Sequence, residues 1–99
     1  YLTDQGVQIL DRNFRTRTGE IDLVGLEGAY LVFFEVKYRS SDRMGDPFSA
    51  VNEKKRLQIV KTARQYLWRH RYPLDAPVRF DCVGITPEGI SWIRNAFSA

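Results

Sequence analysis

The sequence predicts an α+β (mixed α/β) domain in which helices flank a central mixed β-sheet. Three observations support this. Residues 19–39, GEIDLVGLEGAYLVFFEVKYR, hold two apolar segments around a glycine-containing turn, which is typical of an antiparallel hairpin. Residues 52–70 repeat apolar side chains at three- and four-residue steps, the period of an amphipathic helix. Residues 78–97 hold two more strand-like segments around the turn TPEG, so strands surround one long helix.

Length and composition set the broad class. The chain has 99 residues, which predicts one domain over residues 1–99, and its formal net charge of +3 permits a nucleic-acid partner without requiring one. Its one cysteine, Cys82, excludes an internal disulfide and a cysteine zinc cluster and fits a reducing compartment. The longest apolar run, YLVFF, is too short to span a membrane. We therefore expect a cytoplasmic protein with no membrane partner.

Local signals place the remaining segments. YLTDQG predicts the end of a helix that Gly6 closes, and because the chain opens without Met, we expect the first helix to be truncated. Residues 7–9 are strand-like, and the segment then becomes basic up to Arg17. Residues 40–47, SSDRMGDP, are rich in breakers of regular structure and predict a loop.

The predicted helix spans residues 52–70, with Asn52 as its N-cap. Its core face is expected to contain Ile59, Val60, Ala63, Tyr66, Leu67 and His70. A stripe beside that face carries Leu57, Lys61, Arg64 and Trp68. A basic helix with a half-exposed tryptophan can follow a phosphate backbone and stack on a base, or it can be a solvated face with the indole against the core edge.

Charged residues inside the predicted hairpin suggest a site. Glu20 and Asp22 share one face of their strand, and Glu35 and Lys37 share one face of the next, because side chains alternate across a strand. If the turn lies at residues 27–28 or one residue later, Asp22 lies opposite Glu35 or the two residues before it. The two pairs are then cross-strand neighbours, about 5–8 Å apart.

Such a patch of carboxylates suits a divalent cation. Mg²⁺ (or Mn²⁺) takes carboxylate oxygens, backbone carbonyls and water, and the Val36 carbonyl lies between Glu35 and Lys37. A lysine beside the metal can orient a water or stabilise a developing oxyanion, which suits phosphodiester hydrolysis. The alternative is a wet face of an edge hairpin, where the same charges form cross-strand salt bridges.

Two segments resemble a nuclease superfamily. GEIDLV followed by VFFEVKYRSS is similar to the core of the PD-(D/E)xK nucleases, which have a restriction-endonuclease-like fold. More narrowly, the chain resembles the YraN-like bacterial family, an uncharacterised group related to archaeal Holliday junction resolvases. The resemblance continues through a G.P..AV…K segment, A..YL, RFD and a closing NAF, so it covers nearly the whole chain.

The resemblance implies roles for four residues. Asp22 would be the metal-binding aspartate, Glu35 the second metal ligand, Lys37 the catalytic lysine, and Glu20 an additional acid. The implied activity is an Mg²⁺-dependent endonuclease that acts on DNA, including branched or junction DNA. Related resolvases add a glutamate from their first helix, and this chain has no glutamate before Glu20.

Basic residues around the site are expected to contact nucleic acid. These candidates are Arg15, Arg17, Arg39, Lys54, Lys61 and Arg64. Plain solubilising charges are the alternative. The related resolvases are dimers, so a homodimer with Trp68 or Leu57 at the subunit contact is a further expectation.

Two other functional classes stay open. One is a non-catalytic nucleic-acid-binding or interaction module on a nuclease scaffold, which would bind DNA with strong salt dependence and need no metal. The other is a salt-bridged structural domain with no nucleic-acid role. Asp81, in an apolar strand, is expected to pair with Arg79 or a helix lysine, or to support the metal site.

Overall fold

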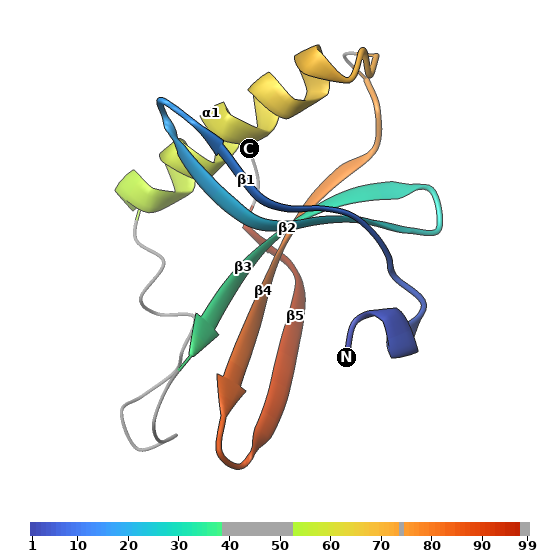
Figure 1. Ribbon diagram of the computed structural model, residues 1–99, viewed down its shortest axis with the longest axis vertical. Coiled ribbons are helices and arrows are strands. Elements are labelled where there is room, and N and C mark those ends of the chain that lie inside the picture. Colours follow the sequence, from blue (N-terminus) through green and yellow to red (C-terminus); the bar gives the residue numbers. More distant parts are fainter. Residues whose placement is uncertain (39–52, 74, 98–99) are drawn as a thin grey trace.

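The computed structural model describes residues 1–38, 53–73 and 75–97 (Figure 1). The chain forms η1 (Thr3–Gln5), β1 (Gln8–Thr16), β2 (Gly19–Glu27), β3 (Tyr30–Tyr38), α1 (Glu53–Arg69), β4 (Val78–Thr86) and β5 (Gly89–Phe97). The strands make one five-stranded sheet in the order β1-β2-β3-β4-β5. Because β3 and β4 are parallel and the other neighbours antiparallel, the sheet is mixed, and the predicted α+β class is confirmed.

The predicted β2–β3 hairpin is confirmed. Glu27 pairs with Tyr30 around Gly28, whose φ of 60° is a left-handed conformation that glycine adopts without a steric cost. The turn therefore lies one residue after residues 27–28, within the predicted range. β1 is longer than the strand-like start at residues 7–9, because its basic half pairs with β2 as far as Thr16.

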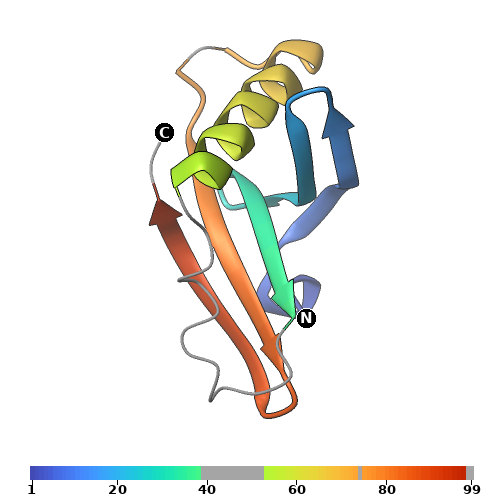
Figure 2. The same ribbon diagram turned by 90° about the vertical axis from the view of Figure 1, so that its left-hand side faces the viewer.

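Helix α1 lies across one end of the sheet, and the β4–β5 hairpin extends away from it (Figures 1 and 2). Ile59, Ala63 and Tyr66 pack into a core that includes Ile21 and Phe33 from the sheet. The Tyr66 ring meets the Phe33 ring edge-on, with 5.7 Å between centroids. A second cluster covers the other face of the sheet and contains Leu2, Val7, Val32, Phe34 and Val83.

Strand β3 contributes to both clusters, which explains its unbroken apolar run. Leu31 and Phe33 face the α1 side, while Val32 and Phe34 face the second cluster. A strand buried on both faces has no need of alternating polar residues. Glu35 follows directly in the same strand, so its carboxylate is buried at the end of this apolar run.

The prediction that His70 belongs to the helix core face is wrong. His70 is exposed in the turn after α1, and its ring stacks on Tyr66 with 4.1 Å between centroids. The helix ends in a Schellman motif, in which Tyr72 N–H donates to the Leu67 carbonyl (2.9 Å) and Arg71 has φ of 57°. This reversal brings Tyr72, not His70, against the core.

The fully buried polar residue of α1 is Thr62, which the apolar pattern did not indicate. Its hydroxyl lies 2.8 Å from the Gln58 carbonyl and 3.0 Å from the Thr18 hydroxyl, so α1 is tied to the β1–β2 turn. The N-cap Asn52, the loop at residues 40–47 and Arg39 lie outside the described residues. Among the residues described, no helix is long and apolar enough to cross a membrane.

Cys82 is buried in β4, and burial, with the Glu35 and Asp81 carboxylates, raises the pKa of its thiol to about 11. The thiolate is the reactive form, so at pH 8 we expect native Cys82 to react with iodoacetamide at least about 100-fold more slowly than an ordinary cysteine. Timed alkylation followed by mass spectrometry measures this. The same reaction in guanidinium chloride is the control and should run at the ordinary rate. Fast labelling of the folded chain would contradict this placement of Cys82.

Candidate functional site: the β2–β3 fork

The pairing of β2 with β3 ends at Leu23 and Phe34, and the predicted site lies directly beyond it. Continued in the same register, the next pair would be Asp22 and Glu35. Instead, the Val36 N–H donates to Oδ2 of Asp22 at 2.8 Å, so a carboxylate replaces a backbone partner. The N–H and carbonyl of one strand residue point to the same side. The Val36 carbonyl therefore also points toward the β2 side, where Asp22 lies.

We call the place where β2 and β3 stop pairing, with Asp22, Glu35, Val36 and Lys37, the fork. Glu35 is its buried acid, with only 5% of its surface exposed. Its Oε1 lies 3.2 Å from the Lys37 Nζ and 3.0 Å from the Lys55 Nζ. Lys37 follows two residues later on the same strand face, as predicted. Lys55 comes from the first turn of α1 and was not among the predicted site residues. The structure thus brings together Asp22, Glu35, Val36 and Lys37, and it adds Lys55.

Burial is the main cause of a raised pKa at Asp22. The Val36 N–H opposes this rise, the charges of Glu35 and Glu20 add to it, and the Lys55 ammonium lowers it. Conversely, the hydrogen bond to Glu35 raises the pKa of Lys55. Asp22 is therefore half-buried and repelled by Glu35 and Glu20, and a cation bound between Asp22 and Glu35 would relieve this repulsion.

Glu20 lies at the rim of the fork. It faces Arg15 across the β1–β2 pairing, and its carboxylate forms an ion pair with the Arg15 guanidinium. Glu20 is still near enough to Asp22 to raise its pKa. Two of the predicted residues, Glu20 and Arg15, are therefore partners of each other.

The fork offers a metal ion a small set of oxygen donors. In the described ranges, no three side chains of the His, Cys, Asp or Glu types are grouped so that they could hold a metal. The fork instead offers two carboxylates, from Asp22 and Glu35, and the carbonyl of Val36. Oxygen donors in this small number suit Mg²⁺ or Mn²⁺, since Mg²⁺ keeps several of its waters when it binds protein.

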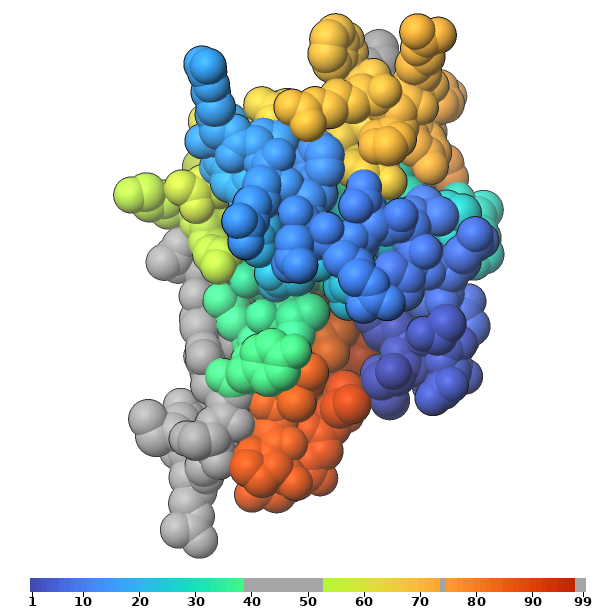
Figure 3. Space-filling view, in the orientation of Figure 1, coloured from blue at the N-terminus to red at the C-terminus, as the bar shows by residue number. Residues whose placement is uncertain are grey.

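A cavity of about 410 Å³ adjoins the fork. Asp22 and Val36 line it, together with Arg12 and Asn13 of β1 and Tyr38 at the end of β3. The N-terminal segment, the end of β3 and the β4–β5 hairpin meet on the face shown in Figure 3. Asn13 has φ of 53°, an irregularity of β1 that no sequence signal predicted.

The other predicted nucleic-acid contacts lie on the surface. Arg15 and Arg17 are exposed at the end of the β1–β2 hairpin, and Lys54, Lys61 and Arg64 are exposed on α1. Trp68 is 82% exposed rather than half-exposed. It borders a second cavity of about 580 Å³, whose lining includes Arg64, Tyr72, Phe80, Asn95 and Phe97.

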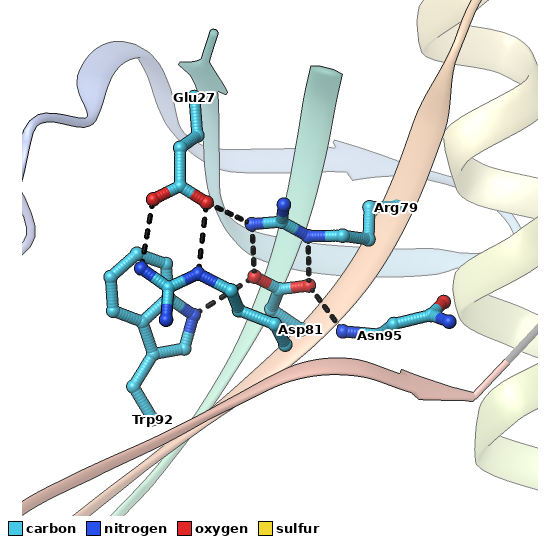
Figure 4. Close-up of polar contacts among 6 residues, drawn as sticks. Glu27, Arg79, Asp81, Trp92 and Asn95 are labelled. Atoms are coloured by element: carbon cyan, nitrogen blue, oxygen red, sulfur yellow. Dashed lines mark hydrogen bonds and ion pairs between the residues drawn. The ribbon is translucent and has the colours of Figure 1, made fainter.

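Asp81 does not belong to the fork. It is completely buried, and it accepts hydrogen bonds from Arg79 Nε (2.9 Å) and Nη2 (2.8 Å), from the Trp92 indole N–H (2.8 Å) and from the Asn95 N–H (2.9 Å) (Figure 4). The expected pairing with Arg79 is confirmed. The alternatives of a helix lysine or a metal-supporting role are wrong, because these four bonds occupy both carboxylate oxygens.

Glu27 extends this network at the end of β2. Its carboxylate accepts bonds from Arg94 (3.0 and 2.9 Å) and from Arg79 (2.6 Å). The Arg94 hydrogen bond and then Arg79 lower the pKa of Glu27 to about 2, against the opposing effect of burial. The network joins β2, β4 and β5 across the sheet.

Comparison with known sequences then places the chain in a family. Residues 1–85 match the model of a family described as "Uncharacterised protein family UPF0102". The chain belongs to UPF0102. Membership confirms the resemblance to the YraN-like family. The description of the family names no reaction.

Relatives of this UPF0102 chain carry the same family name. "UPF0102 protein" of Lachnoclostridium phytofermentans is 50% identical over 99 residues, which are 100% of this chain and 84% of the relative. "UPF0102 protein MCA0184" of Methylococcus capsulatus is 44% identical over 103 residues, covering 100% of this chain and 82% of the relative. A "UPF0102 protein" of Legionella pneumophila is 37% identical over 101 residues, covering 100% of this chain and 86% of the relative.

Proposed function

We propose that this UPF0102 chain is an endonuclease that uses Mg²⁺ or Mn²⁺ to hydrolyse phosphodiester bonds in DNA, including branched or junction DNA. The hydrogen bond from Val36 N–H to Asp22 supports this most strongly. It holds the Asp22 carboxylate beside the strand that carries Glu35 and Lys37. The order Asp, Glu-x-Lys at a strand fork is the arrangement implied by the resemblance to PD-(D/E)xK nucleases.

Each residue of the fork has a role in the proposal. Asp22, Glu35 and the Val36 carbonyl would hold the metal ion, which neutralises phosphate charge and lowers the pKa of a water when bound. Lys37 is half-buried, and Glu35 holds its ammonium at 3.2 Å. It would orient the attacking water or stabilise the negative charge that develops on the phosphate. Glu20, at the rim, would assist metal binding by adding negative charge near Asp22.

The basic face of α1 supports a nucleic-acid substrate. Lys61 and Arg64 are exposed on the helix whose first turn reaches the fork. Trp68 follows on the same side, and stacking of one base on an aromatic ring contributes about 1–3 kcal/mol. A DNA strand that follows α1 would run from the fork to this indole.

Replacement of the proposed catalytic lysine tests the reaction. We expect Lys37→Gln to lower the cleavage rate of a labelled four-way DNA junction in Mg²⁺ by about 10²–10⁴-fold, because general acid–base and charge-stabilising groups contribute this much. Gel analysis of the products measures it. Glu88→Gln, in the exposed β4–β5 turn, is the control and should cleave like the wild type. Equal rates for the wild type and Lys37→Gln would refute the assignment of Lys37.

One observation favours a second function, the non-catalytic DNA-binding module. Two ammonium groups already neutralise Glu35 without any metal. A binding module would bind the same junction equally well in EDTA and in Mg²⁺, with affinity that falls steeply as salt rises. It would leave the junction uncut at every metal concentration.

A further inference from the structure

Glu35 has two cationic neighbours of different origin. Lys37 lies two residues away on the same strand face, and its side chain is only 17% exposed, so its ammonium has little room to move away from Glu35. Lys55 reaches Glu35 from the first turn of α1, and its side chain is 41% exposed. A half-exposed lysine has a flexible four-carbon stem and can reach other acceptors at the surface. Lys55 can thus leave Glu35 without any change in the strand.

Both ammonium groups contact the same oxygen, Oε1 of Glu35. A divalent cation bound to this carboxylate would lie within several ångströms of the Lys55 ammonium. Two positive charges at such a distance repel each other where water is partly excluded. The cation and Lys55 therefore compete for Glu35.

We propose that Lys55 is an exchangeable counter-ion of Glu35. Its ammonium neutralises Glu35 in the metal-free site, and it turns to a phosphate of the substrate when a divalent cation takes the carboxylate. This inference rests on the proposed function. It makes Lys55 a substrate-binding residue whose contribution depends on the metal.

Removal of the Lys55 charge should change two affinities in opposite directions. Without the competing ammonium, the fork binds a divalent cation more tightly, by about tenfold for one partly screened charge. With metal present, DNA binds more weakly, by about three- to tenfold, because a phosphate contact is lost. Without metal, DNA binding changes little, since Glu35 already holds this ammonium.

Calorimetric titration with Mn²⁺ tests the first change. The variants are Lys55→Gln, Lys55→Arg and Lys61→Gln, each checked for a wild-type thermal unfolding curve. We expect tighter Mn²⁺ binding only in Lys55→Gln. Lys55→Arg keeps the charge and should behave like the wild type. Lys61→Gln removes an equal charge from the same helix, away from Glu35, and should leave Mn²⁺ affinity unchanged.

Fluorescence anisotropy with a labelled four-way DNA junction tests the second change. Binding is measured in Ca²⁺, used as a cation that supports binding with little cleavage, and again in EDTA. Lys55→Gln should weaken binding in Ca²⁺ and not in EDTA. Lys61→Gln should weaken it equally in both, because its contact does not depend on the metal.

The outcomes separate this inference from the proposed function. If wild-type protein binds Mn²⁺, Asp22→Asn does not, and Lys55→Gln matches Lys61→Gln in both assays, the inference is overturned while the metal site stands. If the wild type binds no Mn²⁺ with or without DNA, the metal-dependent function is overturned, and the role of Lys55 with it.

Discussion

Asp22→Asn should abolish Mn²⁺ binding and cleavage and at the same time make the metal-free protein more stable. The Asp22 carboxylate is half-buried and repelled by Glu35 and Glu20, and its pKa is raised above 3.8. An asparagine keeps an oxygen that accepts the Val36 N–H but carries no charge. The expected gain is about 1 kcal/mol, or roughly 4–8 °C in the midpoint of thermal unfolding for a domain of this size.

The pH dependence of this gain has a definite sign. A carboxyl whose pKa is higher in the folded than in the unfolded state destabilises the fold once the pH rises through these values. The stability difference between Asp22→Asn and the wild type should therefore be full at pH 7 and should vanish below about pH 3.8. Urea unfolding in EDTA at several pH values measures it.

Asp22→Ala is the matched control. It also removes the charge, but it leaves the Val36 N–H without its acceptor, so it should be less stable than Asp22→Asn by about 1 kcal/mol. Cleavage or Mn²⁺ binding that survives in both variants would remove Asp22 from the site. A loss of stability in Asp22→Asn would show that the carboxylate is a structural group rather than a strained functional one.

Asp81→Ala should be the most destabilising change in the network of β4 and β5. It removes one partner of a buried ion pair and leaves the Trp92 and Asn95 N–H groups without their acceptor (Figure 4). Breaking a buried pair in this way costs about 3–5 kcal/mol, which is a large part of the stability of a small domain. Urea unfolding followed by circular dichroism measures the loss.

Two further variants keep this prediction testable if Asp81→Ala does not fold. Asp81→Asn retains one acceptor oxygen and should lose less stability than Asp81→Ala. Glu27→Gln should cost only about 1 kcal/mol, because Arg79 keeps its bonds to Asp81 and the Arg94 side chain is 51% exposed to water. An Asp81→Ala variant that loses no more stability than Glu27→Gln would contradict the central role of Asp81.

Elements whose structure is set by residues close together in the chain could be predicted from the sequence. The β2–β3 hairpin was predictable because Gly28 permits the turn and the apolar residues on both sides suit strands. The position of the turn limits how the two strands can pair. The sequence therefore placed Asp22 opposite Glu35 or one of the two residues before it. The core face of α1 followed from the helical period at Ile59, Ala63 and Tyr66.

Features at the ends of elements were not predictable in this way. His70 continues the helical period of Tyr66, but the Schellman motif at Arg71 ends the helix there and brings Tyr72 to the core. The basic half of β1 has no strand pattern of its own. It becomes a strand because β2 supplies its hydrogen-bond partners as far as Thr16.

By itself, the sequence determined the α+β class, the resemblance to the YraN-like family and the strand that carries Glu35 and Lys37. Local turn chemistry and hydrophobic period are sufficient for these features, because they act over a few residues. Only the tertiary structure decided that Lys55 meets Glu35 and that Asp81 belongs to a separate network with Arg79 and Trp92. Lys55 and Glu35 lie 20 residues apart, on a helix and a strand, so their contact depends on how α1 docks on the sheet.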